Sequence, residues 1–231
     1  MKECPNTCDV ESCFLCTSCL PDWLPAIASQ RKNFEVKKGQ KIFSEGDNVT
    51  GIYFVYKGTV KIHKRWDKEK ELIVRFAKSG DILGHLGLGD DNFYPVSATA
   101  LEPVIVCYLP MEFFESTLKV NNQFTYILMH FFANQLQESE KRMRNLAHMS
   151  VKGRIAQAFI ALKNQFGIDG SGMINIHISR QDIASFAGIS YETLFKVSND
   201  FILGKLICLD GKTVSIQDEA GLLKVIENDN L

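Results

Sequence analysis

Five cysteines within the first nineteen residues are the side chains of this 231-residue chain whose type and spacing most directly suggest chemistry. Four of them form a Cys-x4-Cys-x2-Cys-x2-Cys run: Cys8, Cys13, Cys16 and Cys19. The N-terminus lacks the apolar stretch of a signal peptide, so a disulfide framework is not expected. Thiolates at such close intervals are typical of metal ligands, tetrahedral zinc among them, or of redox-active thiols.

A second group of chemically informative residues begins at Ser179. Ser179 is expected to cap one helix, with Asp182 three residues later, and Ser190 is expected to cap another. Gly188 supplies the backbone freedom for a tight turn between them. The pattern predicts a helix-turn-helix whose second helix turns its exposed face to base edges in a DNA major groove. An ordinary helical hairpin is the alternative interpretation.

The outward positions of the second helix are the candidate base contacts. Glu192 can accept a hydrogen bond from a cytosine amino group, Lys196 can meet guanine or phosphate, and Phe195 can offer an apolar face to a thymine methyl. Residues 209–216 then carry an Asp-Gly turn between β-prone flanks, which predicts a hairpin wing that touches the phosphate backbone. The expected DNA contacts are Ser179, Arg180, Ser190, Tyr191, Glu192, Phe195, Lys196 and Lys212.

The elements that must position these residues differ along the chain. Short stretches rich in strand-forming residues, at 51–64, 71–76 and 104–109, lie in a region where glycines are frequent, and they predict an all-β roll. Within the first stretch, His63 is expected to face outward beside Lys61. From about 111 to 149 the chain is expected to be helical. Two apolar series seven residues apart predict a dimer seam there, the alternative being a helix buried in its own core. The seam residues are Met129, Phe132, Leu136, Ser139, Met143 and Leu146.

The remaining segments complete the expected organisation. An amphipathic helix is predicted at 151–166 and a short strand at 175–178. Cys107 and Cys208 each lie in an apolar run, which predicts buried core positions.

Composition limits the function classes. The chain has 26 basic and 27 acidic residues, and eight and nine respectively from Ser150 onward, which argues against strong non-specific DNA binding. No apolar run approaches the roughly 20 residues needed to span a bilayer. A cytoplasmic protein of one or two domains is expected. An enzyme such as a cupin oxygenase would need converging histidine and carboxylate ligands, which the sequence does not supply.

Five stretches, in order, resemble the Crp/Fnr family of bacterial transcription regulators. They are KKGQKIFSEGD at 37–47, YFVYKGTVKI at 53–62, SGDILGHLGL at 79–88, VKGRIAQAF at 151–159 and ISRQDIASFAGISYETL at 178–194. The resemblance implies an α+β fold: an N-terminal double-stranded β-roll (a jelly roll like that of cyclic-nucleotide-binding domains), a long dimerisation helix and a C-terminal winged helix-turn-helix. The corresponding domains would be a Cys-rich segment at 1–25, the roll at 26–118, the helix at 119–148 and the winged helix at 149–231.

The family also implies a function. A homodimer would bind a near-palindromic operator in double-stranded DNA under the control of a signal sensed in the roll or its cysteines, with RNA polymerase as a further partner. Oxygen-sensing members read bases through a Glu-x2-Ser-Arg pattern. Here Glu192 is followed by Phe195 and Lys196, so the usual target sequence is not expected.

The resemblance bears on the signal as well. Cyclic-AMP-binding members carry Glu in a Gly-Glu-Leu turn and an Arg-Ser-Ala element soon after. Here His85 replaces the Glu, and no arginine lies between Arg75 and Arg142, which disfavours a nucleotide phosphate clamp.

Members of the fumarate-nitrate regulator type hold a [4Fe–4S] cluster with three N-terminal cysteines and one on a roll strand, and the stretch at 100–110 places Cys107 there. The candidate ligands are therefore Cys8, Cys13, Cys16, Cys19 and Cys107. Their spacing departs from the family's Cys-x2-Cys-x5-Cys, so the cluster, zinc and unligated redox thiols all stay open. The alternative function is a regulatory module that binds a cyclic nucleotide or another small ligand without redox chemistry.

Overall fold

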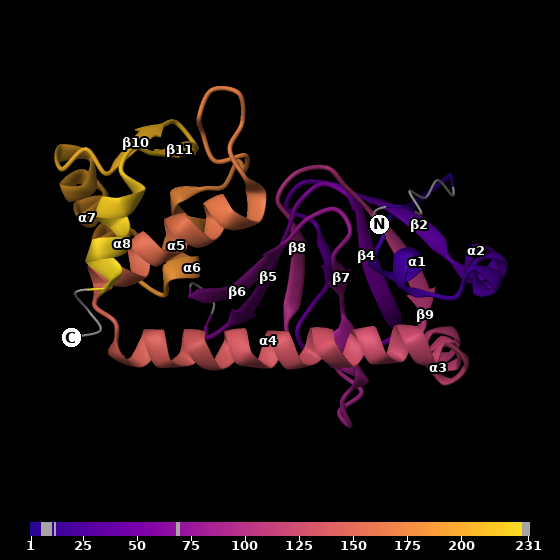
Figure 1. Ribbon diagram of the computed structural model, residues 1–231. Coiled ribbons are helices and arrows are strands. Elements are labelled where there is room, and N and C mark those ends of the chain that lie inside the picture. The colour runs from indigo at the N-terminus through magenta and orange to yellow at the C-terminus, as the bar shows by residue number, and fades with distance from the viewer. Residues whose placement is uncertain (6–10, 12, 68–69, 228–231) are drawn as a thin grey trace. The chain divides into compact units, whose positions relative to one another are not determined.

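The computed structural model describes residues 1–5, 11, 13–67 and 70–227 (Figure 1). The chain divides into two compact units. The N-terminal unit comprises Met1–Trp66 and Val74–Leu136, and the C-terminal unit comprises Asp67–Ile73 and Gln137–Leu231. One long helix, α4 (Asn122–His148), begins in the first unit and ends in the second.

The N-terminal unit is built on two antiparallel sheets, with strand orders β1-β2-β9-β4-β7 and β3-β8-β5-β6 (Figure 1). The non-sequential order is that of a jelly roll, and it confirms the predicted β-roll. The strands are β1 (Lys2–Cys4), β2 (Lys32–Val36), β3 (Lys41–Phe43), β4 (Gly51–Lys57), β5 (Val60–Arg65), β6 (Glu71–Ala77), β7 (Ile82–Leu83), β8 (Ser97–Ala100) and β9 (Val104–Pro110).

Aromatic side chains fill much of the inside of the roll. The rings of Phe43 and Tyr94 stack with centroids 4.1 Å apart, and Tyr53 lies beside Phe43 in the same buried cluster. The Tyr94 hydroxyl donates to the Gly51 carbonyl over 2.7 Å, which satisfies a polar group that the core would otherwise leave unpaired. A Cβ on Gly51 would lie 2.1 Å from the Leu109 carbonyl oxygen, so the close approach of the paired strands β4 and β9 at this point requires glycine.

Short helices flank the roll, and the sequence analysis did not predict them. They are α1 (Phe14–Ser18), η1 (Pro21–Trp23), α2 (Leu24–Gln30) and η2 (His85–Leu88). The helical stretch expected from 111 to 149 is two helices, α3 (Met111–Val120) and α4. Asn121 interrupts them because its backbone is non-helical and its buried side chain accepts a hydrogen bond from the Leu20 N–H over 3.0 Å.

The C-terminal unit contains the predicted helix-turn-helix and hairpin. Its elements, after the end of α4, are α5 (Val151–Phe166), α6 (Arg180–Ala187), α7 (Tyr191–Leu203), β10 (Ile207–Asp210), β11 (Thr213–Ile216) and α8 (Glu219–Glu227). Ser179 accepts from the Asp182 N–H over 3.0 Å and Ser190 from the Thr193 N–H over 3.2 Å, which confirms both caps. Gly188 has φ 67° and ψ 43°, the left-handed conformation that the tight turn needs.

Three local expectations are wrong. Residues 175–178 form no strand: in the described segment between α5 and α6, the β pairing is one isolated bridge, between Ile168 and Ile174. His63 is 2% exposed rather than outward, because its ring shares a 2.8 Å hydrogen bond with the Thr99 hydroxyl across the β5–β8 pair. Cys208 is exposed, because side chains alternate along β10 and Ile207 takes the buried side. Cys107 is buried, as predicted.

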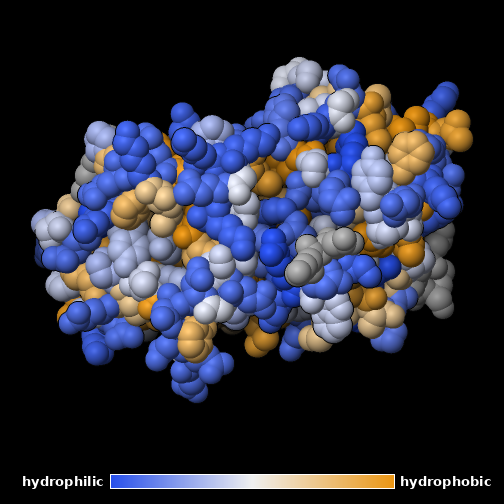
Figure 2. All heavy atoms as spheres, turned by 180° about the vertical axis from the view of Figure 1, so that it is seen from behind, coloured by the Kyte–Doolittle hydropathy of each residue, from blue (hydrophilic) through white to orange (hydrophobic). Residues whose placement is uncertain are grey.

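The surface agrees with the composition. On the face that Figure 2 shows, hydrophilic residues cover most of the surface and hydrophobic ones form small separate groups. Among the helices in the described part of the chain, none combines the length and the apolar character needed to cross a membrane.

Candidate nucleic-acid interface

The second helix of the helix-turn-helix, α7, has distinct inner and outer faces. Leu194 and Phe201 are buried, whereas Tyr191 and Phe195 are 43% and 58% exposed. Glu192 and Lys196 are exposed beside them. Residues three and four apart share a helix face, so the four outward residues at the start of α7 form one surface. We call this surface, made of Tyr191, Glu192, Phe195 and Lys196, the reading face.

The charge of Glu192 is stabilised locally. Hydrogen bonds from its own backbone N–H and from the Ser190 hydroxyl, together with the nearby Lys196 ammonium, lower the pKa of this carboxyl. The side chain is therefore an ionised acceptor at neutral pH. An acceptor at the start of a recognition helix suits the amino group that cytosine presents in the major groove.

The wing follows α7 directly. Its two strands pair in the register Ile207↔Ile216 and Asp210↔Thr213, so Gly211 and Lys212 form the two-residue turn. Gly211 has a φ of 52°, which suits glycine in this turn. Lys212 is exposed at the tip, where the sequence analysis placed it.

Two of the expected DNA contacts, Arg180 and Ser179, already bind other groups within the C-terminal unit. The Nη2 nitrogen of Arg180 donates two hydrogen bonds, to the Gly211 carbonyl over 2.8 Å and to the Thr213 carbonyl over 3.2 Å. Ser179 is partly buried and its hydroxyl donates to the Asp182 carboxylate over 2.5 Å. The sequence indicated Asp182 as the partner of Ser179, but it did not indicate the partners of Arg180, since 31 residues separate Arg180 from Gly211.

The residues of the expected dimer seam fall into two groups. Met129, Leu136 and Met143 are 58%, 62% and 64% exposed, and they follow one line along α4. Phe132 is partly buried against a hydrophobic cluster of the N-terminal unit that contains Phe114, Phe124 and Leu128. Leu146 is also partly buried, and its Cδ2 would lie 2.7 Å from a Cβ on Gly188. Ser139 is exposed.

Four of the five candidate ligand cysteines lie close together in the N-terminal unit, three of them in and around α1 and one on β9. They belong to a single hydrophobic cluster that also contains Phe124 and Leu128 of α4: Cys13, Cys16, Cys19 and Cys107. Burial, with a smaller contribution from Cys13, raises the pKa of Cys19 to about 12, so this residue is a thiol at neutral pH.

The thiol set matches a thiolate-bound group in kind and number. Cys8, the fifth candidate, lies outside the residues that the structure describes. Within those residues, no three His, Cys, Asp or Glu side chains are arranged so that they could hold a metal ion. The donor chemistry fits a cluster, while the described side chains do not by themselves form its ligand sphere.

His85, at the position of the expected nucleotide-binding glutamate, is a core residue. It is 4% exposed, its Nδ1 has no hydrogen-bond partner among the residues that the structure describes, and its ring lies 5.1 and 5.5 Å from the rings of Phe131 and Phe132. Burial, with the Arg75 charge adding to it, lowers the pKa of His85 to about 3. A neutral imidazole under α4 replaces the acidic group that would bind a ribose hydroxyl.

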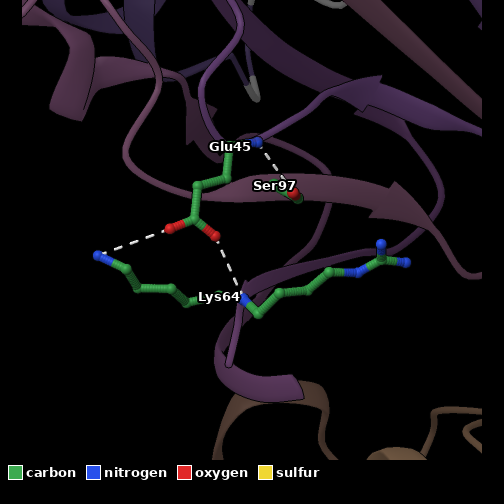
Figure 3. Close-up of polar contacts among 4 residues, drawn as sticks. Glu45, Lys64 and Ser97 are labelled. Carbon is green, nitrogen blue, oxygen red and sulfur yellow. Dashed lines mark hydrogen bonds and ion pairs between the residues drawn. The ribbon is translucent and has the colours of Figure 1, made fainter. Parts of the chain in front are cut away.

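Ser97, in the stretch that corresponds to the Arg-Ser-Ala element, is also engaged. Its hydroxyl accepts the Glu45 N–H over 3.0 Å, and the Glu45 carboxylate accepts the Arg65 N–H over 3.2 Å and lies 3.8 Å from the Lys64 ammonium (Figure 3). Ser97 therefore helps to close the roll's own loops.

Comparisons with known proteins agree with this architecture. A profile described as a cyclic nucleotide-binding domain matches residues 33–121, and one described as a Crp-like helix-turn-helix domain matches residues 153–225. Transcriptional activator protein Anr of Pseudomonas protegens is 28% identical, over 92% of this chain and 90% of that protein. The CRP-like cAMP-activated global transcriptional regulator of Mycobacterium tuberculosis is 25% identical, over 88% of this chain and 92% of that protein.

The solved structure of FixK2 from Bradyrhizobium japonicum has the same fold. It superposes with a TM-score of 0.75 at 20% identity, over 84% of this chain and 96% of that one. A β-roll followed by a long helix and a winged helix-turn-helix defines a DNA-binding transcription regulator. The chain belongs to the Crp/Fnr family of such regulators, and the relatives it matches are regulators rather than enzymes.

Proposed function

We propose that the protein acts as a homodimer that reads a near-palindromic operator with two copies of α7. The observation that carries this proposal is the reading face itself. Both helices of the motif have their serine caps, Gly188 makes the turn, and four outward side chains remain exposed beside a wing with Lys212 at its tip. An ordinary hairpin gives no reason for Phe195 to be 58% exposed between two charged residues.

The exposed line along α4 supports the dimer. Met129, Leu136 and Met143 are seven residues apart, and the 27-residue helix leaves each more than half exposed. Apolar side chains at this interval bury themselves when two helices pair. Phe132 and Leu146 pack within their own units, so the seam is narrower than the sequence pattern indicated. Two-fold symmetry would place the half-sites about one DNA turn, roughly 34 Å, apart.

Each proposed contact has a distinct role. We expect three side chains to read base edges: Glu192, Lys196 and Phe195. Tyr191 and Ser190 lie at the N-terminus of α7, where that end of the helix would approach the DNA backbone. Lys212 would bind a phosphate. RNA polymerase is the partner through which a bound regulator would act, and the cytoplasm is where it would meet DNA.

The experiment that tests base reading compares variants on a selected operator. Glu192→Ala should relax specificity at one base pair with little change in the salt dependence of binding, whereas Lys212→Ala should reduce the salt slope by about one. Glu102→Ala, which removes an exposed glutamate from the roll, is the matched control. Equal losses for Glu192→Ala on all sequences would contradict base reading.

For the signal, we infer that the cysteine group is the sensor. Its support is the shared cluster in which Cys13, Cys16, Cys19 and Cys107 pack with Phe124 and Leu128 of α4. A change at these thiols would alter packing under the helix that carries the proposed dimer seam. A [4Fe–4S] cluster, held by these cysteines or by Cys8 with three of them, would supply sensitivity to oxygen or redox state.

Metal analysis after anaerobic purification tests the sensor. Four iron and four sulfide per chain would establish the cluster, and one zinc per chain would replace it with a zinc site. A metal-free protein whose DNA affinity responds to thiol oxidation would leave redox-active thiols as the sensor. A metal-free protein with oxidation-independent affinity would contradict the inference.

The second candidate is a small-ligand sensor of the cyclic-nucleotide kind. The profile over residues 33–121 and the cAMP-activated relative favour it. The buried, neutral His85 and the engaged Ser97 oppose it. Titration with a fluorescent cyclic nucleotide separates the two candidates, and tight binding would favour the second.

A further inference from the structure

We propose that Arg180 is a positioning residue that holds the wing turn on the helix-turn-helix and thereby presents Lys212 to DNA. That Lys212 meets DNA rests on the proposed function of the wing. That Arg180 holds the turn does not depend on that function. Arg180 is the first residue of α6, whereas the turn that it contacts lies beyond α7.

The contact geometry is specific to the tip of the wing. The Gly211 and Thr213 carbonyls flank Lys212, and one guanidinium nitrogen binds both, over 2.8 and 3.2 Å. Two simultaneous bonds fix the direction of the turn as well as its distance from α6. The backbone on each side of Lys212 is therefore held by Arg180.

Two backbone contacts outside the turn also anchor the hairpin. Val214 accepts the Ile174 N–H over 2.8 Å, and Leu206 accepts the Gln217 N–H over the same distance. By contrast, Asp210, Gly211 and Lys212 are exposed, so little buried apolar surface fixes the tip. A two-stranded hairpin alone is marginally stable in water. The tip thus depends on polar contacts such as those of Arg180.

The chemistry requires arginine rather than a positive charge alone. Arg180 is partly buried, and its guanidinium forms these bonds from a rigid planar group, whereas a lysine ammonium is a point charge on a flexible stem. If Arg180 served only as a phosphate contact, Arg180→Lys would keep most of its effect. If it holds the turn, Arg180→Lys should behave like Arg180→Gln.

Hydrogen exchange of the full-length protein without DNA tests the holding directly. We expect Arg180→Lys and Arg180→Gln each to raise exchange at the Thr213 and Val214 amides at least threefold, with the α5 amides unchanged. Lys212→Ala, which removes the tip's charge and leaves the Arg180 bonds in place, should not change exchange there. Unchanged exchange in both Arg180 variants would overturn the proposal.

DNA binding then tests whether Arg180 acts through Lys212. Arg180→Lys and Lys212→Ala should each weaken operator binding, and the double variant should be no weaker than the weaker single one. Independent, additive losses would overturn the positioning role in favour of a separate phosphate contact. Faster exchange with unchanged affinity would support Arg180 as the wing's tether and contradict only the proposed wing contact with DNA.

Discussion

The Arg142 guanidinium carbon lies 4.7 Å from the centre of the Phe186 ring, and the same guanidinium donates to the Phe186 carbonyl over 2.7 Å. A cation–π contact and a hydrogen bond thus join the C-terminal part of α4 to α6. Burial lowers the pKa of Arg142 to about 10, which leaves it charged at neutral pH. The residue connects the proposed dimer helix to the first helix of the DNA-binding motif.

Arg142→Gln should lower the free energy of unfolding by about 1–3 kcal/mol, because it leaves a buried acceptor without its charged donor. Urea unfolding measures this loss. Lys141→Gln is the matched control, since Lys141 is exposed and pairs with Glu138 on the surface of the same helix. That control should change the free energy by less than about 0.5 kcal/mol. Equal effects of the two substitutions would contradict a special role for Arg142.

His85 should make the roll sensitive to acid. Its pKa of about 3 in the fold lies below the ordinary value of 6.5. Between these values the unfolded chain binds a proton that the folded chain does not, so stability falls as pH drops from about 6.5 toward 3. The largest contribution to the slope is about 1.4 kcal/mol per pH unit.

The comparison between variants isolates this residue from other titrating groups. His85→Gln should give a shallower fall in unfolding free energy from pH 7 to pH 4.5 than the wild type. Parallel slopes for the wild type and His85→Gln would show that His85 is protonated in the folded protein.

The cysteines should differ in alkylation rate. Cys208 is exposed, whereas Cys13, Cys16, Cys19 and Cys107 are buried, and burial raises the pKa of Cys19 to about 12. Iodoacetamide at pH 8 should therefore label Cys208 before the four buried cysteines, and peptide mass spectrometry follows each site. Denatured protein should lose this order. Equally fast labelling of Cys19 and Cys208 in the native protein would contradict the packing of the N-terminal segment.

The dimer seam can be tested at its middle position. Leu136→Glu places a charge on the exposed apolar line of α4 and should weaken self-association at least tenfold, with little effect on the folding of one chain. Gln137→Glu, which adds the same charge at the next exposed position, is the control. Sedimentation equilibrium measures both. A Leu136→Glu protein that associates as tightly as the control would place the interface elsewhere.

The features that the sequence predicted well are local ones. Ser179, Gly188 and Ser190 act within four residues of their own positions, and the Asp-Gly pair at 210–211 favours a turn through its own backbone preferences. Caps, turns and helical spacing are decided by short-range sterics and hydrogen bonds, so a single sequence contains them.

The features that it missed depend on distant partners. Asn121 ends a helix because it binds Leu20, His63 is buried because it meets Thr99, and Arg180 turns to the wing carbonyls instead of outward. At each of these positions a contact with a distant residue overrides the structure that the local sequence pattern favours, and the neighbouring residues do not indicate that contact. The α8 helix was not predicted because it has only nine residues and contains Gly221, which disfavours a helix.

In-vitro selection of operator sequences, followed by the stoichiometry of the bound complex, tests the central claim most directly. We expect a two-fold symmetric consensus with half-site centres about 10 base pairs apart, bound by two chains, with Glu192→Ala degenerate at one position in each half. A single asymmetric site bound by one chain, or no consensus at all, would contradict a dimer that reads DNA with two copies of α7.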